Sequence, residues 1–484
     1  MSRSTRRYFL QQTALAGGLL ALTPRSFAAS ANEQVNMGII GLGWRGGDLL
    51  KAFSELPGVT IAGICDPDSD LVDQRSQEYP QAKTYSDLRQ MLDSPDIDAV
   101  AVATCNHWHC LAAIWAMQAG KHVYVEKPLS NALWEGEQVV KAATKYDKIC
   151  QVGTQQRSAP MQAEIKSLLH DDKLIGPIDW VRVNRFGLRA SVGKRDTPLE
   201  PPKTVDYNIW LGPAQDQPLY RDKFHYDWHW DWNTGAGEMG NWGVHIVDDV
   251  RNNIFRDSVA FPQRVAAAGG RFAWHDAGNT PNIHFAILDT GTIPVVIGLS
   301  NIAADADHKV QPRCTGPGSG YIAYCEAGRL EGQRGNAKFF DSDGKVIKEI
   351  RGTDGMGVHQ QNFIDAIRNS SPGSLNAPVE VGHHSSAWCN FANYAYRVDA
   401  KDASQPLAEF DFDFATGVGA GKMLIELSRL IEVHDKQFPR EGLQLGPVLR
   451  FDAAKEQFTG KHADAANKFL RTPGREKFVV PEVS

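Results

Sequence analysis

Short apolar runs alternate with helical patterns in the N-terminal part of the chain. The runs Val35–Ile40, Val59–Cys65 and Ile97–Ala103 have the length and composition of buried strands. Apolar positions recur at helical spacing in Arg45–Leu56 and again in Leu133–Tyr146. The same criteria predict helices at Tyr85–Leu92 and Leu111–Ala119 and strands at His122–Val125 and Ile149–Val152. Strands that alternate with helices predict βαβ units on one parallel sheet, and therefore a doubly wound α/β Rossmann domain over residues 32–155.

The pattern changes after residue 155. Alternating apolar and polar positions, separated by long insertions rich in Pro and Trp, predict a mostly antiparallel sheet. Its strands are expected at Trp180–Arg185, Asn282–Leu288, Pro294–Leu299 and Lys338–Phe340, with helices at Val358–Asn369 and Ser385–Tyr396. The second domain, residues 156–450, is thus predicted to be α+β with an open sheet, whose free face favours a homo-oligomer. Residues 451–484 are polar with little periodicity, and we expect a tail that wraps the surface or serves as an oligomer arm.

Residues 1–31 have the composition of a secretory leader. The twin arginines Arg6 and Arg7 precede an apolar run, Thr13–Leu22, and small residues at Ala28–Ala31 offer a cleavage site. The apolar run is too short to span a membrane. We therefore expect export by the twin-arginine translocation (Tat) pathway to the periplasm or another extracytoplasmic compartment, with the protein already folded.

Composition argues against several classes of partner. The chain has 51 Lys and Arg against 57 Asp and Glu, a formal net charge of -6 and an isoelectric point near 6.2. No basic surface favours nucleic acid or an anionic membrane, so a small neutral ligand fits better. The seven cysteines are too dispersed for a disulfide framework. Buried thiols are expected, with only Cys314 and Cys325 placed so that they could pair after export.

A glycine-rich turn joins the first predicted strand to the first helix. Gly41 permits the tight turn, Gly43 lets the backbone approach a pyrophosphate, and Gly46 lets the helix pack closely on the strand. Asp66, directly after the second strand, can accept hydrogen bonds from ribose hydroxyls and repels a 2′-phosphate. This context predicts NAD. NADP remains a second possible cofactor because of Arg45. The other alternative is a Rossmann-like domain that binds no nucleotide.

Two further polar segments, Thr104–His109 and Tyr124–Pro128, follow the carboxyl ends of predicted strands. Ligands of open α/β sheets bind at that edge. We therefore expect the cofactor to be contacted by Gly41, Gly43, Trp44, Arg45, Gly46, Asp66, Thr104, Asn106, His109, Glu126 and Lys127.

These segments resemble the Gfo/Idh/MocA family of sugar oxidoreductases, and the leader suggests a Tat-exported subgroup of it. The family's Glu-Lys-Pro signature corresponds to Glu126-Lys127-Pro128, and the resemblance continues through 152–157 and through Gly235-Ala236-Gly237 to His245. It implies hydride transfer between a sugar carbon and nicotinamide, assisted by the lysine and an Asp-x-x-x-His pair. Lys127 matches the lysine and His245 the histidine, whereas Asn241 stands at the Asp position.

The resemblance makes Lys127, Asn241 and His245 the predicted catalytic residues. Residues four apart on a helix share a face, so Asn241 and His245 can both reach a substrate. Because an amide cannot take a proton, we expect Asn241 to orient a group, His245 to remove the proton and Lys127 to stabilise the alkoxide. Because the Asp is missing, a carbohydrate-binding protein without catalytic activity is the alternative function.

Tyr226–Trp232, followed by Trp242, combines aromatic rings with interleaved carboxylates. Indole rings suit the C–H faces of sugars and carboxylates suit their hydroxyls, which favours a carbohydrate-binding wall over a structural loop or subunit contact. The predicted substrate contacts are His107, Gln156, Arg157, Trp228, Asp231 and His245. No metal is expected, because the histidine pairs lack a Cys or carboxylate at a recognised ligand spacing.

Export constrains the chemistry, since free NAD is scarce outside the cytoplasm. A tightly carried cofactor must be reset in place, which predicts a redox-neutral reaction on a sugar or sugar derivative. The possibilities are oxidoreduction between two sugars, epimerisation, and transient oxidation that permits elimination of a glycosidic substituent. The last resembles the NAD-dependent glycosidases of the same family, which diverge at the Glu-Lys-Pro motif retained here.

Overall fold

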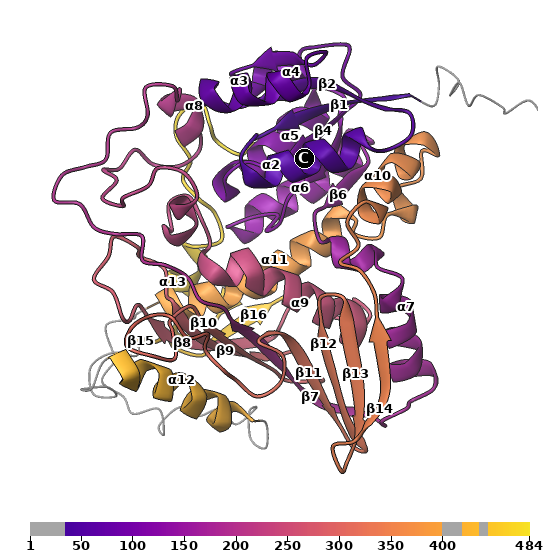
Figure 1. The fold of residues 1–484 in the computed structure, drawn as a ribbon, viewed down its shortest axis with the longest axis vertical. Coiled ribbons are helices and arrows are strands. Elements are labelled where there is room, and N and C mark those ends of the chain that lie inside the picture. The colour runs from indigo at the N-terminus through magenta and orange to yellow at the C-terminus, as the bar shows by residue number, and fades with distance from the viewer. Residues whose placement is uncertain (1–33, 399–418, 435–443) are drawn as a thin grey trace, which may run out of the picture. The chain divides into compact units, whose positions relative to one another are not determined.

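Two sheets organise the computed structural model, which describes residues 34–398, 419–434 and 444–484 (Figure 1). The expected leader, residues 1–31, lies outside the described residues. Among those described, one sheet has six strands in the order β3-β2-β1-β4-β5-β6 and the other has eleven. Both belong to one compact unit, Val35–Ser484. The predicted combination of a Rossmann domain with a mostly antiparallel second domain is confirmed.

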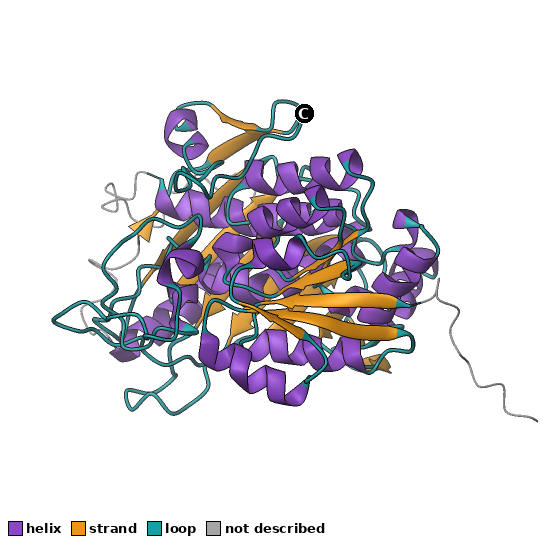
Figure 2. Ribbon diagram, turned by 90° about the horizontal axis from the view of Figure 1, so that it is seen from above, coloured by secondary structure: helices purple, strands orange, loops and turns teal. Residues whose placement is uncertain are grey.

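All pairs in the six-stranded sheet are parallel. Its elements are β1 (Val35–Ile40), α2 (Trp44–Ser54), β2 (Val59–Cys65), α3 (Ser69–Glu78), β3 (Lys83–Tyr85), α4 (Leu88–Leu92), β4 (Ala99–Val102), α5 (His109–Gln118), β5 (His122–Val125), α6 (Leu133–Lys145) and β6 (Cys150–Val152). Helices lie on both sides of these strands (Figure 2). In β4, Val100 and Val102 face one apolar cluster while Ala99 and Ala101 face another. Burial on both faces explains why such strands are continuous apolar runs.

Two local predictions in this domain need correction. The predicted helix Tyr85–Leu92 begins only at Leu88, because Asp87 accepts a hydrogen bond from the Arg89 amide at 2.9 Å and caps the helix, while Tyr85 ends β3. Helix α3 was not predicted at all. Val72 is its one buried residue, so no apolar stripe marks it in the sequence.

The second sheet runs in the order β14-β13-β12-β11-β7-β10-β9-β8-β16-β17, with β15 paired to β8. Its strands are β7 (Ile178–Phe186), β8 (Arg264–Gly270), β9 (Ile283–Asp289), β10 (Val295–Ser300), β11 (Ser319–Cys325), β12 (Gly328–Gln333), β13 (Asn336–Asp341), β14 (Val346–Arg351), β15 (Gln444–Leu445), β16 (Leu449–Asp452) and β17 (Gln457–Thr459). Pairing is antiparallel except between β7 and β10. The longest strand, β7, therefore joins a hairpin region to a second antiparallel region.

Helices cover both faces of this sheet. The long helix α11 (Val379–Arg397) packs on one face and α12 (Ala420–His434) on the other (Figure 1). Because α11 starts six residues before the predicted Ser385, its buried side extends towards the Rossmann domain. The remaining helices are α7 (Met161–Lys166), α8 (Tyr207–Leu211), α9 (Val244–Val250), α10 (Val358–Arg368) and α13 (Ala463–Asn467).

Residues 444–484 fold against both domains. After β16, β17 and α13, the chain returns to the Rossmann domain, where Phe478, Val480 and Val483 join the apolar cluster of α5. The Phe478 ring meets Trp108 edge to face, with centroids 5.6 Å apart. The polar composition of residues 451–484 therefore predicted a surface tail, whereas three of their apolar side chains pack into the core.

In the described part of the chain no helix is long and apolar enough to cross a membrane. All seven cysteines are free thiols, including Cys314 and Cys325.

Replacing Phe478 by Ala should lower the free energy of unfolding by about 3 kcal/mol, because its ring is 5% exposed and the cavity left behind cannot be filled. Urea denaturation measures the change. The control is Val479→Ala, since Val479 is 38% exposed and should change stability by less than about 0.5 kcal/mol. Equal stabilities of the two variants would contradict docking of this segment.

Candidate active site

A cavity of about 1160 Å³ lies at the carboxyl edge of the parallel sheet and is lined by both domains. Its wall includes all but one of the predicted cofactor residues, namely Gly41, Gly43, Trp44, Arg45, Asp66, Thr104, Asn106, His109, Glu126 and Lys127. Asn241, His245 and Trp228 line it too. Gly46 is not among the lining residues. Predicted site residues from segments as far apart as 41 and 245 therefore line one cavity.

The glycine turn leaves room for a phosphate group. A Cβ on Gly46 would lie 1.9 Å from the Gly41 carbonyl oxygen, so only glycine lets α2 start this close to the strand. Gly41 has φ +89°, and a Cβ there would lie 2.6 Å from the Ala103 oxygen. A Cβ on Gly43, by contrast, meets no atom within 4 Å. This open position at the amino end of a helix fits the pyrophosphate of a dinucleotide.

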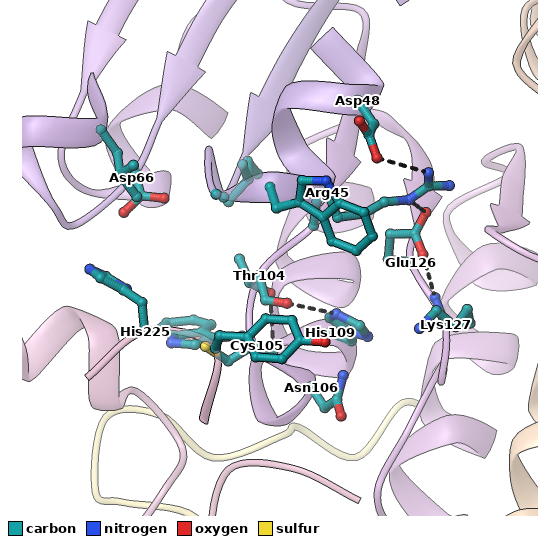
Figure 3. Close-up of a pocket in the computed structure, with 18 of the residues that line it drawn as sticks. Arg45, Asp48, Asp66, Thr104, Cys105, Asn106, His109, Glu126, Lys127 and His225 are labelled. Atoms are coloured by element: carbon teal, nitrogen blue, oxygen red, sulfur yellow. Dashed lines mark hydrogen bonds and ion pairs between the residues drawn. The ribbon is translucent and has the colours of Figure 1, made fainter. Parts of the chain in front are cut away.

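Asp66 closes the end of the cavity beyond the glycine turn (Figure 3). Its carboxylate accepts hydrogen bonds from the Leu42 amide at 2.7 Å and the Asp68 amide at 2.9 Å. Burial raises the pKa of Asp66 to about 6. A carboxylate has about four acceptor positions, so two remain for the hydroxyls of a ribose. The residues present therefore fit NAD.

Arg45 points to the opposite end of the cavity from Asp66 (Figure 3). Its Nε donates to Glu126 Oε1 at 2.7 Å, and its terminal nitrogens contact Met356 Sδ at 3.7 Å. Glu126 is buried at the end of β5, where its amide donates to the Val102 carbonyl. The signature glutamate thus neutralises Arg45 and fixes the start of α2 against β5.

His109 ties two strand ends together. Its Nδ1 lies 2.7 Å from the Pro128 carbonyl oxygen and its Nε2 lies 3.1 Å from that of Thr104. Burial lowers the pKa of His109. A neutral imidazole has one N–H, so one of these nitrogens donates to its carbonyl and the other only packs against the second one; the ring lies between the two loops that line the cavity.

Lys127 enters the cavity from the end of β5. Its Nζ donates to the backbone oxygen of Asn241 at 3.0 Å and to Asn241 Oδ1 at 3.3 Å. Burial lowers the pKa of Lys127 to about 8. An ammonium has three N–H donors, so one remains for a ligand.

Asn241 is held in one orientation by a carboxylate. It lies in a π-helical turn, Met239–Gly243, that leads into α9. Its Nδ2 donates to Glu238 Oε2 at 3.2 Å, which aims Oδ1 at Lys127. Glu238 itself is paired with Arg185 at 2.7 Å and with Arg189 at 3.1 Å.

His245 lies beside Trp242, with ring centroids 5.8 Å apart, and both line the cavity. Burial, followed by the positive charges of Lys127 and Arg334, lowers the pKa of His245 well below its usual value. His245 is therefore neutral at ordinary pH. It can exchange hydrogen bonds with a hydroxyl but is a weak base.

Arg334 is a cavity residue that sequence reasoning missed. It occupies the turn between β12 and β13, where no motif marks it. Its Nε donates to Gln156 Oε1 at 3.0 Å and its guanidinium lies 4.9 Å from the Trp242 ring centre. Trp242 is thus flanked by Arg334 and, at 4.5 Å, by Arg185.

The predicted substrate residues divide into three groups. Trp228 and His245 line the cavity. Gln156 and Arg157 lie behind it, where Gln156 bonds Arg334 and Asp249 while Arg157 pairs with Asp248 at 2.7 Å. His107 and Asp231 line a separate cavity. In the described ranges no group of three or more His, Cys, Asp or Glu side chains could hold a metal ion.

Comparison with protein families gives two adjacent matches. Residues 35–154 match the Gfo/Idh/MocA model described as "Oxidoreductase family, NAD-binding Rossmann fold". Residues 162–303 match the model of the same family described as "Oxidoreductase family, C-terminal alpha/beta domain". Together the two models span more than half of the chain.

Curated relatives match a shorter part. A glycosyl hydrolase family 109 protein of Shewanella pealeana is 33% identical over 173 residues, which is 30% of this chain and 38% of that protein. An alpha-N-acetylgalactosaminidase of Shewanella oneidensis is 36% identical over 127 residues, 24% of this chain and 28% of that protein. The similarity therefore covers well under half of these relatives.

Solved structures share the fold at low identity. The WlbA dehydrogenase from Bordetella pertussis, in complex with NADH and UDP-GlcNAcA, has a TM-score of 0.54 and 18% identity and covers 73% of this chain and 94% of that chain. An oxidoreductase from Agrobacterium radiobacter, in complex with NAD+, L-tartaric acid and magnesium, has a TM-score of 0.54 and 15% identity and covers 75% and 95%.

Affinity for NAD should fall as the pH drops below about 6, the pKa of Asp66, because only the ionised carboxylate is a full acceptor for the ribose hydroxyls. The decrease should approach about tenfold per pH unit. Fluorescence titration at several pH values measures it. Asp66→Asn should remove this dependence and weaken discrimination against NADP. If the variant keeps the pH profile of the wild type, a group other than Asp66 causes the change in affinity.

Proposed function

Because the chain belongs to the Gfo/Idh/MocA oxidoreductase family, we propose that it transfers hydride between NAD and a carbon of a sugar or sugar derivative. The observation that carries this proposal is the meeting of Lys127, Asn241 and His245 in the cavity beside the glycine turn. Two domains contribute to that meeting. Residues that only stabilised the fold would have no need to share a cavity of this size.

NAD, when bound, supplies the hydride acceptor and donor. Lys127 moves the proton in our proposal: its free N–H position can donate to a substrate oxygen, and with a pKa of about 8 its neutral form can take the hydroxyl proton. Asn241 holds Lys127 in place through two acceptors. His245, neutral because of its lowered pKa, orients the same hydroxyl. This assignment reverses the roles expected from the sequence for Lys127 and His245.

Two features favour NAD over NADP in this proposal. Asp66 is an acceptor and, when ionised, an anion at the end of the cavity where the ribose would lie. Arg45, the residue that left NADP open, is engaged with Glu126 at the other end.

Aromatic side chains support a carbohydrate substrate. Tyr226, Trp228, His229 and Trp242 line the cavity and offer ring faces to the C–H faces of a sugar. UDP-GlcNAcA in the complex of the WlbA dehydrogenase is consistent with this substrate class. The leader composition supports export, and a protein that carries NAD out of the cytoplasm requires a redox-neutral cycle.

Glycoside cleavage through transient oxidation is the second candidate, supported by the family 109 relatives. It uses the same cavity and the same first hydride transfer. The two candidates differ in product, because cleavage releases a free leaving group with no net reduction of NAD.

The test begins with the bound nucleotide. Denatured, freshly purified protein should release NAD in near-stoichiometric amount, and absorbance should report its reduction in a single turnover with hexoses, sugar acids or glycosides. Released aglycone without net reduction would favour cleavage. Ligand binding with no reduction and no cleavage would favour a carbohydrate-binding protein instead.

The rate of sugar oxidation should rise with pH through about 8, because the base must be unprotonated and burial sets the pKa of Lys127 there. Lys127→Met should lower the single-turnover rate about a hundredfold or more and remove this dependence. Lys121→Met is the matched control, since Lys121 donates to the Ser94 carbonyl outside the cavity and should not affect the rate. If Lys127→Met keeps the pH dependence of the wild type, a group other than Lys127 takes the hydroxyl proton.

Substitutions of Asn241 should move that pH midpoint in opposite directions. Asn241→Asp places an anion at the oxygen now 3.3 Å from Lys127 Nζ, which should raise the midpoint by roughly one unit. The second oxygen of the new carboxylate replaces the Nδ2 that now donates to Glu238 Oε2 at 3.2 Å; Arg185 and Arg189 offset the repulsion between the two carboxylates, and the added charge also acts on Lys127. Asn241→Leu removes the side-chain acceptor, keeps the backbone acceptor and should lower the midpoint. Midpoints that do not separate in single-turnover profiles would contradict the Lys127–Asn241 coupling.

A further inference from the structure

A second cavity of about 400 Å³ shares no lining residue with the first. It lies between the start of α6, the segment 231–236, the end of α11 and the segment 468–473. His107 belongs to the wall between the two cavities: its ring nitrogens lie 3.2 Å from the carbonyl oxygens of Thr234 and Trp210, and Trp210 lines the first cavity.

Two asparagines that line this cavity each have a side-chain oxygen with no hydrogen bond to the described part of the chain. Asn393 is 3% exposed, and its Nδ2 donates to the Ala236 carbonyl at 3.1 Å, which leaves Oδ1 without a hydrogen bond. Asn131 Oδ1 is likewise buried and unpartnered. Buried acceptors without donors are costly, and because these two oxygens have almost no accessible surface, a ligand hydroxyl reaches them only when the amide groups turn towards the cavity.

The cavity also holds a guanidinium that forms no ion pair with the residues the structure describes. Arg397 lies between the rings of Trp232, at 4.7 Å, and Phe469, at 4.2 Å, and makes no hydrogen bond or ion pair with any described residue. Lys468 and Arg471 stand at the rim, and within the described ranges neither forms an ion pair, although the charge of Arg471 acts on Glu135 at longer range. Stacking leaves the N–H edge of a guanidinium available for a carboxylate or phosphate.

The acidic residues of the cavity are already engaged. Asp231 accepts from the Asn233 amide and from Asn279 Nδ2, both at 3.0 Å, and lies 3.8 Å from Arg221. Glu135 accepts from the hydroxyl and amide of Thr472, and burial raises its pKa to about 7. Neither carboxylate neutralises Arg397.

We propose that the second cavity binds a polyhydroxylated anion, a sugar acid or a sugar phosphate, whose acidic group pairs with Arg397 and whose hydroxyls donate to Asn131 and Asn393. Water could satisfy the two amide oxygens, but it leaves the guanidinium charge unpaired. The cavity volume is within the range of small-molecule sites. This site is separate from the catalytic cavity and does not depend on the reaction proposed there.

Calorimetric titration of the full chain tests the site with three probes: gluconate, glucose 6-phosphate and the neutral polyol sorbitol. We expect saturable binding of at least one anion, and the anion that binds identifies the acidic group. Arg397→Gln should weaken that binding about tenfold or more, because it removes a charge-assisted hydrogen bond. Asn131→Asp, which puts a negative charge into the cavity, should weaken it as well.

Controls assign the binding to this cavity. Arg329→Gln removes another ring-stacked arginine, 4.0 Å over Phe340, and should leave the dissociation constant unchanged. Arg334→Gln alters the first cavity and should also leave it unchanged. Melting curves confirm folding, and Asn131→Asp alone decides the matter if Arg397→Gln does not fold. The proposal fails if no anion binds, if sorbitol binds as tightly, or if the folded cavity variants bind as the wild type does.

Discussion

The site depends on how the protein buries the positive charge of Lys127 without giving it a carboxylate. A buried ammonium is costly unless it is hydrogen-bonded, and here its two partners are both oxygens of Asn241. Their dipoles hold the side chain in place but do not neutralise it, so burial can lower its pKa towards neutrality. A carboxylate at position 241 would stabilise the ammonium and make it a poorer base. The departure from the family's Asp is therefore compatible with proton transfer, provided that the lysine is the group that transfers the proton.

This arrangement requires both domains. Lys127 follows the parallel strand β5, whereas Asn241 is presented by a π-helical turn of the second domain and is oriented by Glu238. Glu238 in turn is fixed by Arg185 of β7, the strand on which the two parts of the large sheet join. The chain of contacts runs from β7, in the middle of the large sheet, to the carboxyl end of β5 in the parallel sheet. Local distortion of that turn would change the environment of Lys127 without touching the nucleotide side.

The sequence predicted the parts of the fold that are marked by apolar burial and missed those that are not. Parallel strands such as β4 are apolar on both faces, so their positions were clear, whereas α3 presents almost no buried side chain. The glycine turn and the Glu-Lys-Pro segment were recognisable because chemistry restricts each residue. Arg334 was not, because a cavity residue on a hairpin turn has no local signal. Spacing also could not tell that Gln156 and Arg157 would face the protein interior behind the cavity.

The dense aromatic segment shows most clearly why the sequence could not separate sites. Its residues were expected to form one wall, yet Tyr226, Trp228 and His229 line the first cavity while Asp231 and Trp232 line the second. A short helical turn, Asp227–Trp230, explains the division, since it ends at Asp231 and the chain there becomes extended. Trp230, between the two groups, is buried. The division therefore rests on one buried ring and one carboxylate: Trp230 packs between the two groups, and Asp231 fixes the loops beside the second cavity by accepting hydrogen bonds from the Asn233 amide and from Asn279 Nδ2.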